Sequence, residues 1–151
     1  MTGLVIIAAV TLVPWIELRG AIPLGLAMGY HPLLVFAISV GVNCLLVIPG
    51  FVALDLLYTR WLSAIPWVRA QVERVRARGS RYVERYELLG LALFVAIPLP
   101  GTGAYSGTLL AWLLGLDRRR AGVAIAAGVL TAGVAVTLAT LGVVSVLKVL
   151  R

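Results

Sequence analysis

The sequence has one cysteine and one histidine among its 151 residues, and both scarcities limit its chemistry. Cys44 has no second cysteine with which to form an intramolecular disulfide. Together with His31 it cannot supply the ligands of a transition-metal site. A Ser-His-Asp arrangement would have to use His31, and no serine stands in a suitable turn beside it. We therefore expect no metal, no cofactor and no enzymatic activity.

Charged residues are also scarce, at 13% of the chain, whereas hydrophobic residues make up 62% and the mean hydropathy is +1.06. This composition excludes an ordinary soluble domain. The formal net charge is +7, which in a soluble protein would suggest a nucleic-acid partner. Here the arginines gather between apolar stretches, where they orient membrane segments and contact anionic lipid headgroups. We expect membrane lipids as partners and no nucleic acid.

The apolar residues form four blocks, at about 1–30, 32–58, 88–116 and 120–148. A helix needs about 20 apolar residues to cross roughly 30 Å of hydrocarbon, so the second and fourth blocks fit uninterrupted spans. The fourth block also carries small residues four apart, at Ala124, Gly128 and Ala132. This spacing favours close helix packing, and we expect it to mediate homo-oligomerisation.

The first and third blocks are each interrupted near the middle, at residues 14–23 and 98–107. Irregular backbone at bilayer depth is tolerated only where protein buries it or where it lines a cavity. Two interruptions in corresponding positions point to a transporter site. The arms beside the second interruption reach about 15 Å each, half of the hydrocarbon thickness. The pattern therefore predicts two re-entrant helical hairpins.

The arginines decide between a hairpin and a full span. Residues 60–87 contain seven arginines, and the cluster Arg118–Arg120 follows the third block. If that block crossed the membrane once, the two clusters would lie on opposite sides, against the positive-inside rule. We therefore predict an all-α integral membrane protein with one domain over residues 1–151. It is an inverted-topology repeat, in which each half is a hairpin followed by a full span; the halves are residues 1–58 and 88–151.

The connector over residues 59–87 is expected to be cytoplasmic and to lie on the membrane surface. Apolar residues repeat along one face of a helix predicted between Trp67 and Leu89, with arginines on the other face and a hinge at Gly79. The apolar residues of this face are Val68, Val72, Val75, Tyr82, Val83, Tyr86 and Leu89.

The first interruption places Glu17 and Arg19 at bilayer depth, between Pro14 and Pro23. An ionisable group there costs a few kcal/mol, so it normally has a partner, a wet cavity or a function. Two interpretations stay open: a substrate or coupling site, and a structural pair that locks the hairpin tip. Trp15 lies close enough to the interruption to line a cavity.

The second interruption is uncharged but rich in glycine and hydroxyl groups. A helix that starts near 102–104 would present its N-terminus to the membrane midplane, a favourable position for an anion. Alternatively, the glycines let the two tips pack closely. The candidate substrate-binding or coupling residues of the chain are Glu17, Arg19, Gly20, Pro23, Asn43, Pro100, Gly101, Thr102, Gly103, Tyr105 and Ser106; Asn43 would bond a hairpin tip or a neighbouring helix.

The strings Glu17-Leu18-Arg19-Gly20-Ala21-Ile22-Pro23 and Pro98-Leu99-Pro100-Gly101-Thr102-Gly103-Ala104-Tyr105-Ser106-Gly107 resemble those of the prokaryotic family labelled putative small multidrug export proteins. The likeness covers nearly the whole chain and implies the cell (inner) membrane. The arrangement is also similar to the DedA (VTT-domain) membrane proteins, which implies re-entrant hairpins and lipid translocation. The second hairpin lacks the arginine of DedA proteins.

These features favour a transporter or lipid flippase for a small amphiphilic or anionic substrate, such as a polyprenyl-phosphate-like lipid. Glu17 would take up and release a proton, while Arg19 and the backbone at 102–103 would hold an anionic head. One alternative is an exporter of cationic drugs, with Glu17 as the counter-charge. Others are a channel and a structural or assembly membrane protein whose connector docks a partner.

Overall fold

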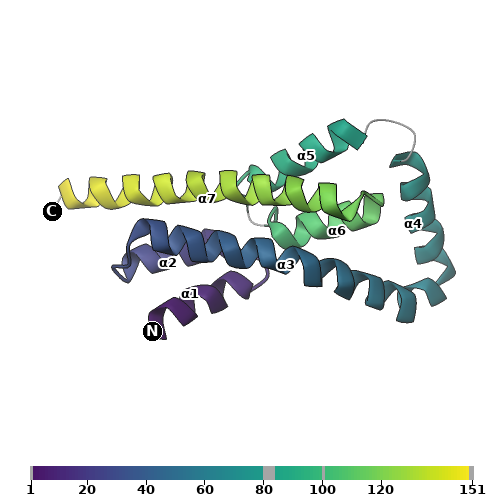
Figure 1. The fold of residues 1–151 in the computed structure, drawn as a ribbon, viewed down its shortest axis with the longest axis horizontal. Coiled ribbons are helices and arrows are strands. Elements are labelled where there is room, and N and C mark those ends of the chain that lie inside the picture. Colours follow the sequence, from purple (N-terminus) through teal and green to yellow (C-terminus); the bar gives the residue numbers. More distant parts are fainter. Residues whose placement is uncertain (1, 80–83, 100, 150–151) are drawn as a thin grey trace.

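The computed structural model describes residues 2–79, 84–99 and 101–149, and over these residues every regular element is a helix (Figure 1). This confirms the prediction of an all-α fold. The elements in chain order are α1 (Thr2–Leu12), α2 (Glu17–Ala27), α3 (Pro32–Arg60), the short 3-10 helix η1 (Leu62–Ala64), α4 (Pro66–Gly79), α5 (Glu84–Ala96), α6 (Ala104–Leu114) and α7 (Arg118–Val149).

Two long helices, α3 and α7, lie side by side and run in opposite directions (Figure 1). Residues Pro32–Ala64 and Arg118–Val146 are long and apolar enough to cross a membrane, by length and composition. Each begins at a capping side chain. The Nδ1 atom of His31 accepts a hydrogen bond from the Leu33 amide at 3.3 Å, and the Asp117 carboxylate accepts one from the Arg120 amide at 2.9 Å.

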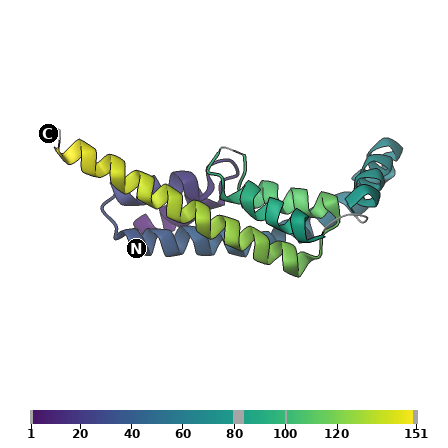
Figure 2. The ribbon, with the colours of Figure 1, turned by 90° about the horizontal axis from the view of Figure 1, so that it is seen from above.

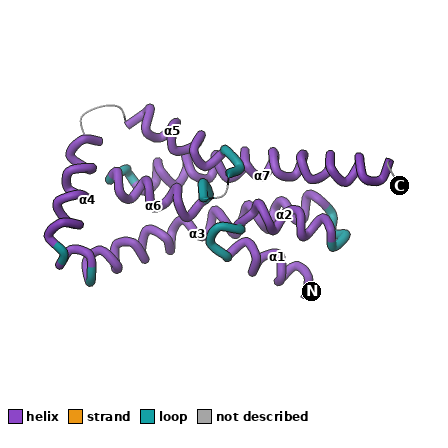
Figure 3. Tube along the Cα trace, turned by 180° about the vertical axis from the view of Figure 1, so that it is seen from behind, coloured by secondary structure: helices purple, strands orange, loops and turns teal. Residues whose placement is uncertain are grey.

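The short helices fold back on one another in two pairs, α1 with α2 and α5 with α6. The pairs approach from opposite ends of the molecule, and their connecting loops meet near its centre (Figure 3). The order of two short helices and one long helix therefore occurs twice along the chain. Both sequence interruptions, at 14–23 and 98–107, fall at these central loops.

The first central loop has a strained backbone. Trp15 and Glu17 have φ angles of 80° and 47°, in the left-handed region that non-glycine residues rarely adopt. Such conformations persist only where surrounding contacts hold them, and they gather at functional sites. Pro23, by contrast, lies within the continuous helix α2.

The small residues of α7 pack against other parts of the same protomer. A Cβ atom on Gly128 would lie 2.6 Å from the carbonyl oxygen of Ala92 and 2.7 Å from Val95 Cβ, both on α5. Ala124 and Ala132 are also buried within the protomer. This face is therefore not free to join copies of the chain, because the same protomer buries it, with α5 at Gly128. Homo-oligomerisation through another surface stays a prediction. Close helix packing at this spacing is confirmed.

The helix predicted between Trp67 and Leu89 is divided, and its first piece, α4, ends at Gly79, where the sequence predicted a hinge. Residues 84–89 belong to α5, and the predicted Tyr82 and Val83 lie outside the described residues. Val72 is buried, while Arg69 and Glu73 form an exposed ion pair on α4. Figure 2 shows α4 at the end of the molecule away from the C-terminus.

Candidate functional site

Arg19, in the first turn of α2, binds the loop of the other hairpin. Its Nη2 atom donates to the carbonyl oxygens of Ile97 at 3.0 Å and Thr102 at 2.9 Å, and to the Thr102 hydroxyl at 2.8 Å. Its Nη1 atom donates to the Leu99 carbonyl. These carbonyls follow the end of α5, where a helix leaves acceptors without intrahelical partners. The planar guanidinium fork satisfies several of them at once.

Glu17 binds the same hairpin as a hydrogen-bond acceptor, whereas Arg19 binds it as a donor. Its Oε2 and Oε1 atoms accept hydrogen bonds from the backbone amides of Ala104, at 3.0 Å, and Tyr105, at 3.3 Å. These are the first two residues of α6, so the carboxylate satisfies orphan donors at the positive end of the helix dipole. The side chain is 5% exposed. The sequence predicted an anion site at this N-terminus, and the anion that occupies it is Glu17 itself.

Gly103 permits this approach of Glu17 to α6, because a Cβ atom at this position would overlap the Glu17 carboxylate.

One further contact joins a side chain of the second hairpin to the backbone of the first. The Tyr105 hydroxyl donates to the carbonyl oxygen of Leu12, at 2.7 Å, at the end of α1. Each hairpin therefore binds the backbone of the other hairpin with its side chains.

A cavity of about 260 Å³ lies at this junction. It combines one carboxylate and one guanidinium with aromatic and apolar walls. Trp15 is 78% exposed, so its indole is available to a molecule in the cavity. The lining residues are Pro14, Trp15, Glu17, Arg19, Gly101, Gly103, Tyr105, Ser106 and Leu109.

The cavity brings together six of the predicted site residues: Glu17, Arg19, Gly101, Gly103, Tyr105 and Ser106. Thr102 contributes behind it, as a partner of Arg19. Gly20 and Pro23 do not line it, and Pro100 lies outside the described residues. Their roles in binding stay predictions.

Asn43 does not line the cavity either, and the expected bond to a hairpin tip or a neighbouring helix is wrong. Its side chain is fully buried in α3, and neither amide atom has a hydrogen-bond partner among the described residues. The same holds for the hydroxyl of Ser39, one turn earlier.

Sequence reasoning placed Trp15 near a cavity, which is confirmed, but it missed Pro14 and Leu109. Leu109 lies one helical turn after Tyr105, and this spacing of four residues on α6 was the available signal.

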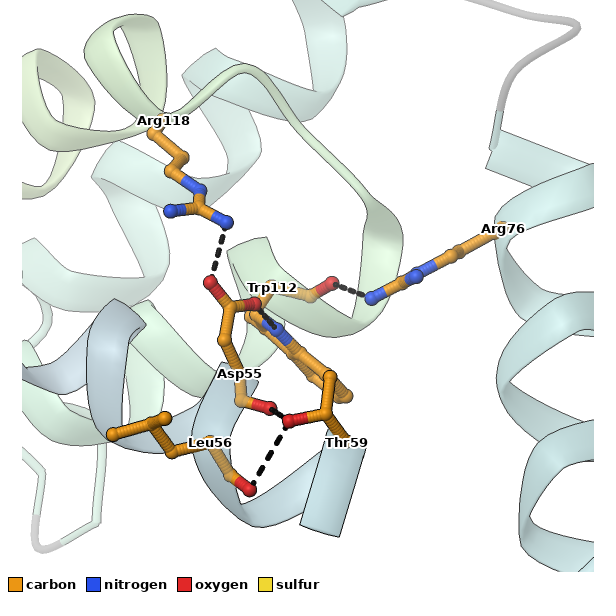
Figure 4. A network of polar contacts seen from close by, with 6 residues as sticks. All are labelled: Asp55, Leu56, Thr59, Arg76, Trp112 and Arg118. Carbon is orange, nitrogen blue, oxygen red and sulfur yellow. Dashed lines mark hydrogen bonds and ion pairs between the residues drawn. The ribbon is translucent and has the colours of Figure 1, made fainter. Parts of the chain in front are cut away.

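A second polar cluster lies where α3, α4, α6 and α7 meet (Figure 4). The Asp55 carboxylate accepts hydrogen bonds from Trp112 Nε1 at 2.8 Å and from Arg118 at 2.5 Å. Arg76 of α4 donates to the Trp112 carbonyl at 3.3 Å and lies 4.8 Å from the centre of an indole ring of the same residue. This cluster joins helices, and sequence analysis missed it because the partners are far apart in the chain.

A family profile described as "Putative small multi-drug export protein" matches residues 17–135. The match begins at Glu17 and includes the second hairpin. No curated protein and no solved structure matches the chain. The relation to DedA proteins and the lipid substrate therefore stay predictions. The match and the two long apolar helices indicate a membrane protein. The chain belongs to the family of small multidrug export proteins.

Proposed function

We propose that this protein exports small amphiphilic molecules across a membrane, and that they bind in the cavity at the junction of the hairpin tips. The observation that carries this proposal is the position of Glu17 and Arg19, which line a cavity of about 260 Å³ at the junction of two apolar helix hairpins. Ionisable groups in such surroundings are costly and normally serve function. The family description, which names multidrug export, supports the same conclusion.

The lengths of the helices support a membrane placement in which the hairpins are re-entrant. Helices α1, α2 and α6 have 11 residues each, and at about 1.5 Å per residue each reaches roughly half of the hydrocarbon core. The hairpins then enter from opposite leaflets as an inverted repeat, while α3 and α7 cross. The arginines of α4 and of the first turn of α7 support a placement of that end in the cytoplasm, by the positive-inside rule.

The occupied hydrogen-bonding groups favour a cationic substrate over an anionic lipid. The N-terminus of α6 already binds Glu17, and the two Nη atoms of Arg19 already bind carbonyls, which leaves only its buried Nε atom without a partner among the described residues. The cavity adds the aromatic rings of Trp15 and Tyr105, which suit a cation with an apolar body. Its volume suits a small molecule and not a polyprenyl chain. We therefore prefer the cationic exporter to the lipid flippase.

In the proposed mechanism, Glu17 exchanges a proton for the substrate. The ionised carboxylate holds the first hairpin against α6 through charge-assisted hydrogen bonds. A proton or a substrate cation on Glu17 weakens these bonds, so that the tips can separate. Because the hairpins enter from opposite sides, their movements open the cavity to one side or to the other.

The test uses full-length protein in vesicles with an imposed pH gradient and ethidium as the transported cation. We expect Glu17→Gln to lower the initial rate at least tenfold, because the amide carries neither the negative charge nor the proton. Glu73→Gln is the matched control, since Glu73 is a carboxylate on the exposed face of α4. Equal rates for Glu17→Gln and the unmodified protein would overturn the proposal.

A binding measurement separates cation export from phosphate transport. Ethidium should bind less tightly to Glu17→Gln and more tightly to Arg19→Gln, whereas a phosphate head should lose affinity in Arg19→Gln. If the protein instead has an assembly role, substitutions of exposed arginines on α4, such as Arg74→Gln, should impair its function in cells. The substitutions at Glu17 and Arg19 should then leave that function unchanged.

A further inference from the structure

Two apolar grooves flank the first half of α7. One lies between α7 and α3, has a volume of about 520 Å³ and includes Val47, Phe51 and Gly122. The other lies between α7 and α5, has a volume of about 510 Å³ and includes Leu88 and Ala92. Both grooves are separate from the cavity at the hairpin tips.

The same two residues of α7, Arg119 and Val123, line both grooves. They lie four residues apart and so follow one another along one face of the helix. Val123 is 71% exposed. These two residues therefore form a ridge with an apolar groove on each side and a guanidinium at its end.

The charges around this ridge leave Arg119 available. Arg118 pairs with Asp55 across the gap between α7 and α3 (Figure 4). Asp117 caps the first turn of α7. The Arg119 side chain is exposed, and within residues 2–79, 84–99 and 101–149 it makes no hydrogen bond or ion pair. The positive end of the α7 dipole lies in the same turn and favours an anion there.

We infer that one anionic phospholipid binds astride this ridge, with its phosphate on Arg119 and one acyl chain in each groove. The charge and the shape agree: one available cation lies at the head of two apolar grooves, and a diacyl phospholipid has one phosphate and two chains. Arginines at a membrane surface attract anionic lipids. A soluble anion would use Arg119 but leave both grooves uncovered.

The first test compares lipids on the full-length protein in detergent, with dissociation constants from native mass spectrometry. Dioleoyl-phosphatidylglycerol should bind about fivefold more tightly than dioleoyl-phosphatidylcholine, the contribution expected of one arginine. It should also bind more tightly than its single-chain lyso form. Equal binding of the first two lipids overturns the charge assignment, and equal binding of the lyso form overturns the two-groove assignment. Full competition by glycerol phosphate would overturn the lipid assignment.

The second test uses variants of α7. Arg119→Gln should remove the preference for phosphatidylglycerol over phosphatidylcholine. Gly122→Leu should weaken both lipids, because a Cβ atom on Gly122 meets nothing within 4 Å and the longer side chain extends into the α3 groove. Gly142→Leu is the matched control, since Gly142 is also a glycine of α7 with open space around it but lies outside both grooves. Unchanged affinities in both Arg119→Gln and Gly122→Leu would overturn the site.

The only cysteine of the chain provides a readout that needs no substitution. Cys44 lines the groove between α3 and α7. Bound phosphatidylglycerol should therefore slow its modification by N-ethylmaleimide more than phosphatidylcholine does at the same concentration. The same rate with both lipids would place the lipid elsewhere and overturn the inference.

Discussion

The two hairpins have the same outline but opposite chemistry. Glu17 and Arg19 lie in the first turn of α2, directly after the loop between α1 and α2, and the backbone there is strained, with φ angles of 80° at Trp15 and 47° at Glu17. The loop between α5 and α6 carries no charge among its described residues, 97–99 and 101–103, and offers backbone carbonyls, while the first turn of α6 offers backbone amides. The side chains of Arg19 and Glu17 bind these carbonyls and amides.

This division explains how a broken helix pair persists in an apolar environment. Helix ends leave amides and carbonyls unpaired, and in the proposed re-entrant placement no water of the hydrocarbon region would satisfy them. A negative group for the amides and a positive group for the carbonyls meet this need together. The interpretations of Glu17 and Arg19 as a lock and as a site therefore describe the same atoms, because the groups that hold the tips together also line the cavity.

We expect the largest effect on the contact between the two hairpins from Gly103→Ala. The added methyl group would overlap the Glu17 carboxylate and displace it from the amides of Ala104 and Tyr105. We expect a loss of about 3 kcal/mol in the free energy of unfolding, measured by thermal denaturation of the purified protein. Gly90→Ala is the control, because its methyl group meets nothing within 4 Å. Equal stability of the two variants would contradict the tight approach.

Arg19→Lys asks whether charge alone is enough. Lysine keeps the positive charge but cannot reach the carbonyls of Ile97, Leu99 and Thr102 with a single ammonium group. We expect a loss of about 2 kcal/mol of stability from the hydrogen bonds that lysine does not replace. Unchanged stability in the same denaturation experiment would show that the guanidinium fork is dispensable.

Tyr105→Phe tests the contact that runs from the second hairpin to the first. It removes the hydrogen bond from the hydroxyl to the Leu12 carbonyl, at 2.7 Å, and keeps the aromatic wall of the cavity. The expected loss of stability is about 1 kcal/mol, with ethidium binding nearly unchanged. A loss as large as that of Arg19→Lys would mean that the two directions of contact are equally important.

The sequence predicted the all-helical fold and its two long helices because these signals are local. Apolar length and helix breakers identified the long helices, both interruptions and Trp15 as a wall residue, whereas the re-entrant inverted repeat stays a prediction. Glu17 and Arg19 were recognised because charge is rare in this chain, at 13% of residues. Their partners were not, because Glu17 binds backbone amides and Arg19 binds backbone carbonyls, groups that nearly every residue possesses.

The errors of prediction have a common physical cause. The small-residue spacing at Ala124, Gly128 and Ala132 indicates a close helix neighbour but does not identify it, and α5 of the same chain is that neighbour. Asn43 was expected to have a partner because buried polar groups usually do. Which helix covers a given face depends on the whole topology, and no local pattern encodes it.

Because α4 contacts α6, a displacement of the second hairpin can be measured at α4, outside the bundle. The Arg76 guanidinium touches both the backbone and the ring of Trp112, near the end of α6. When the second hairpin shifts along its axis, this contact must either break or move α4 with it. A fluorophore on the solvent-facing side of α4 would then report hairpin displacement in real time, without a probe in the lipid phase.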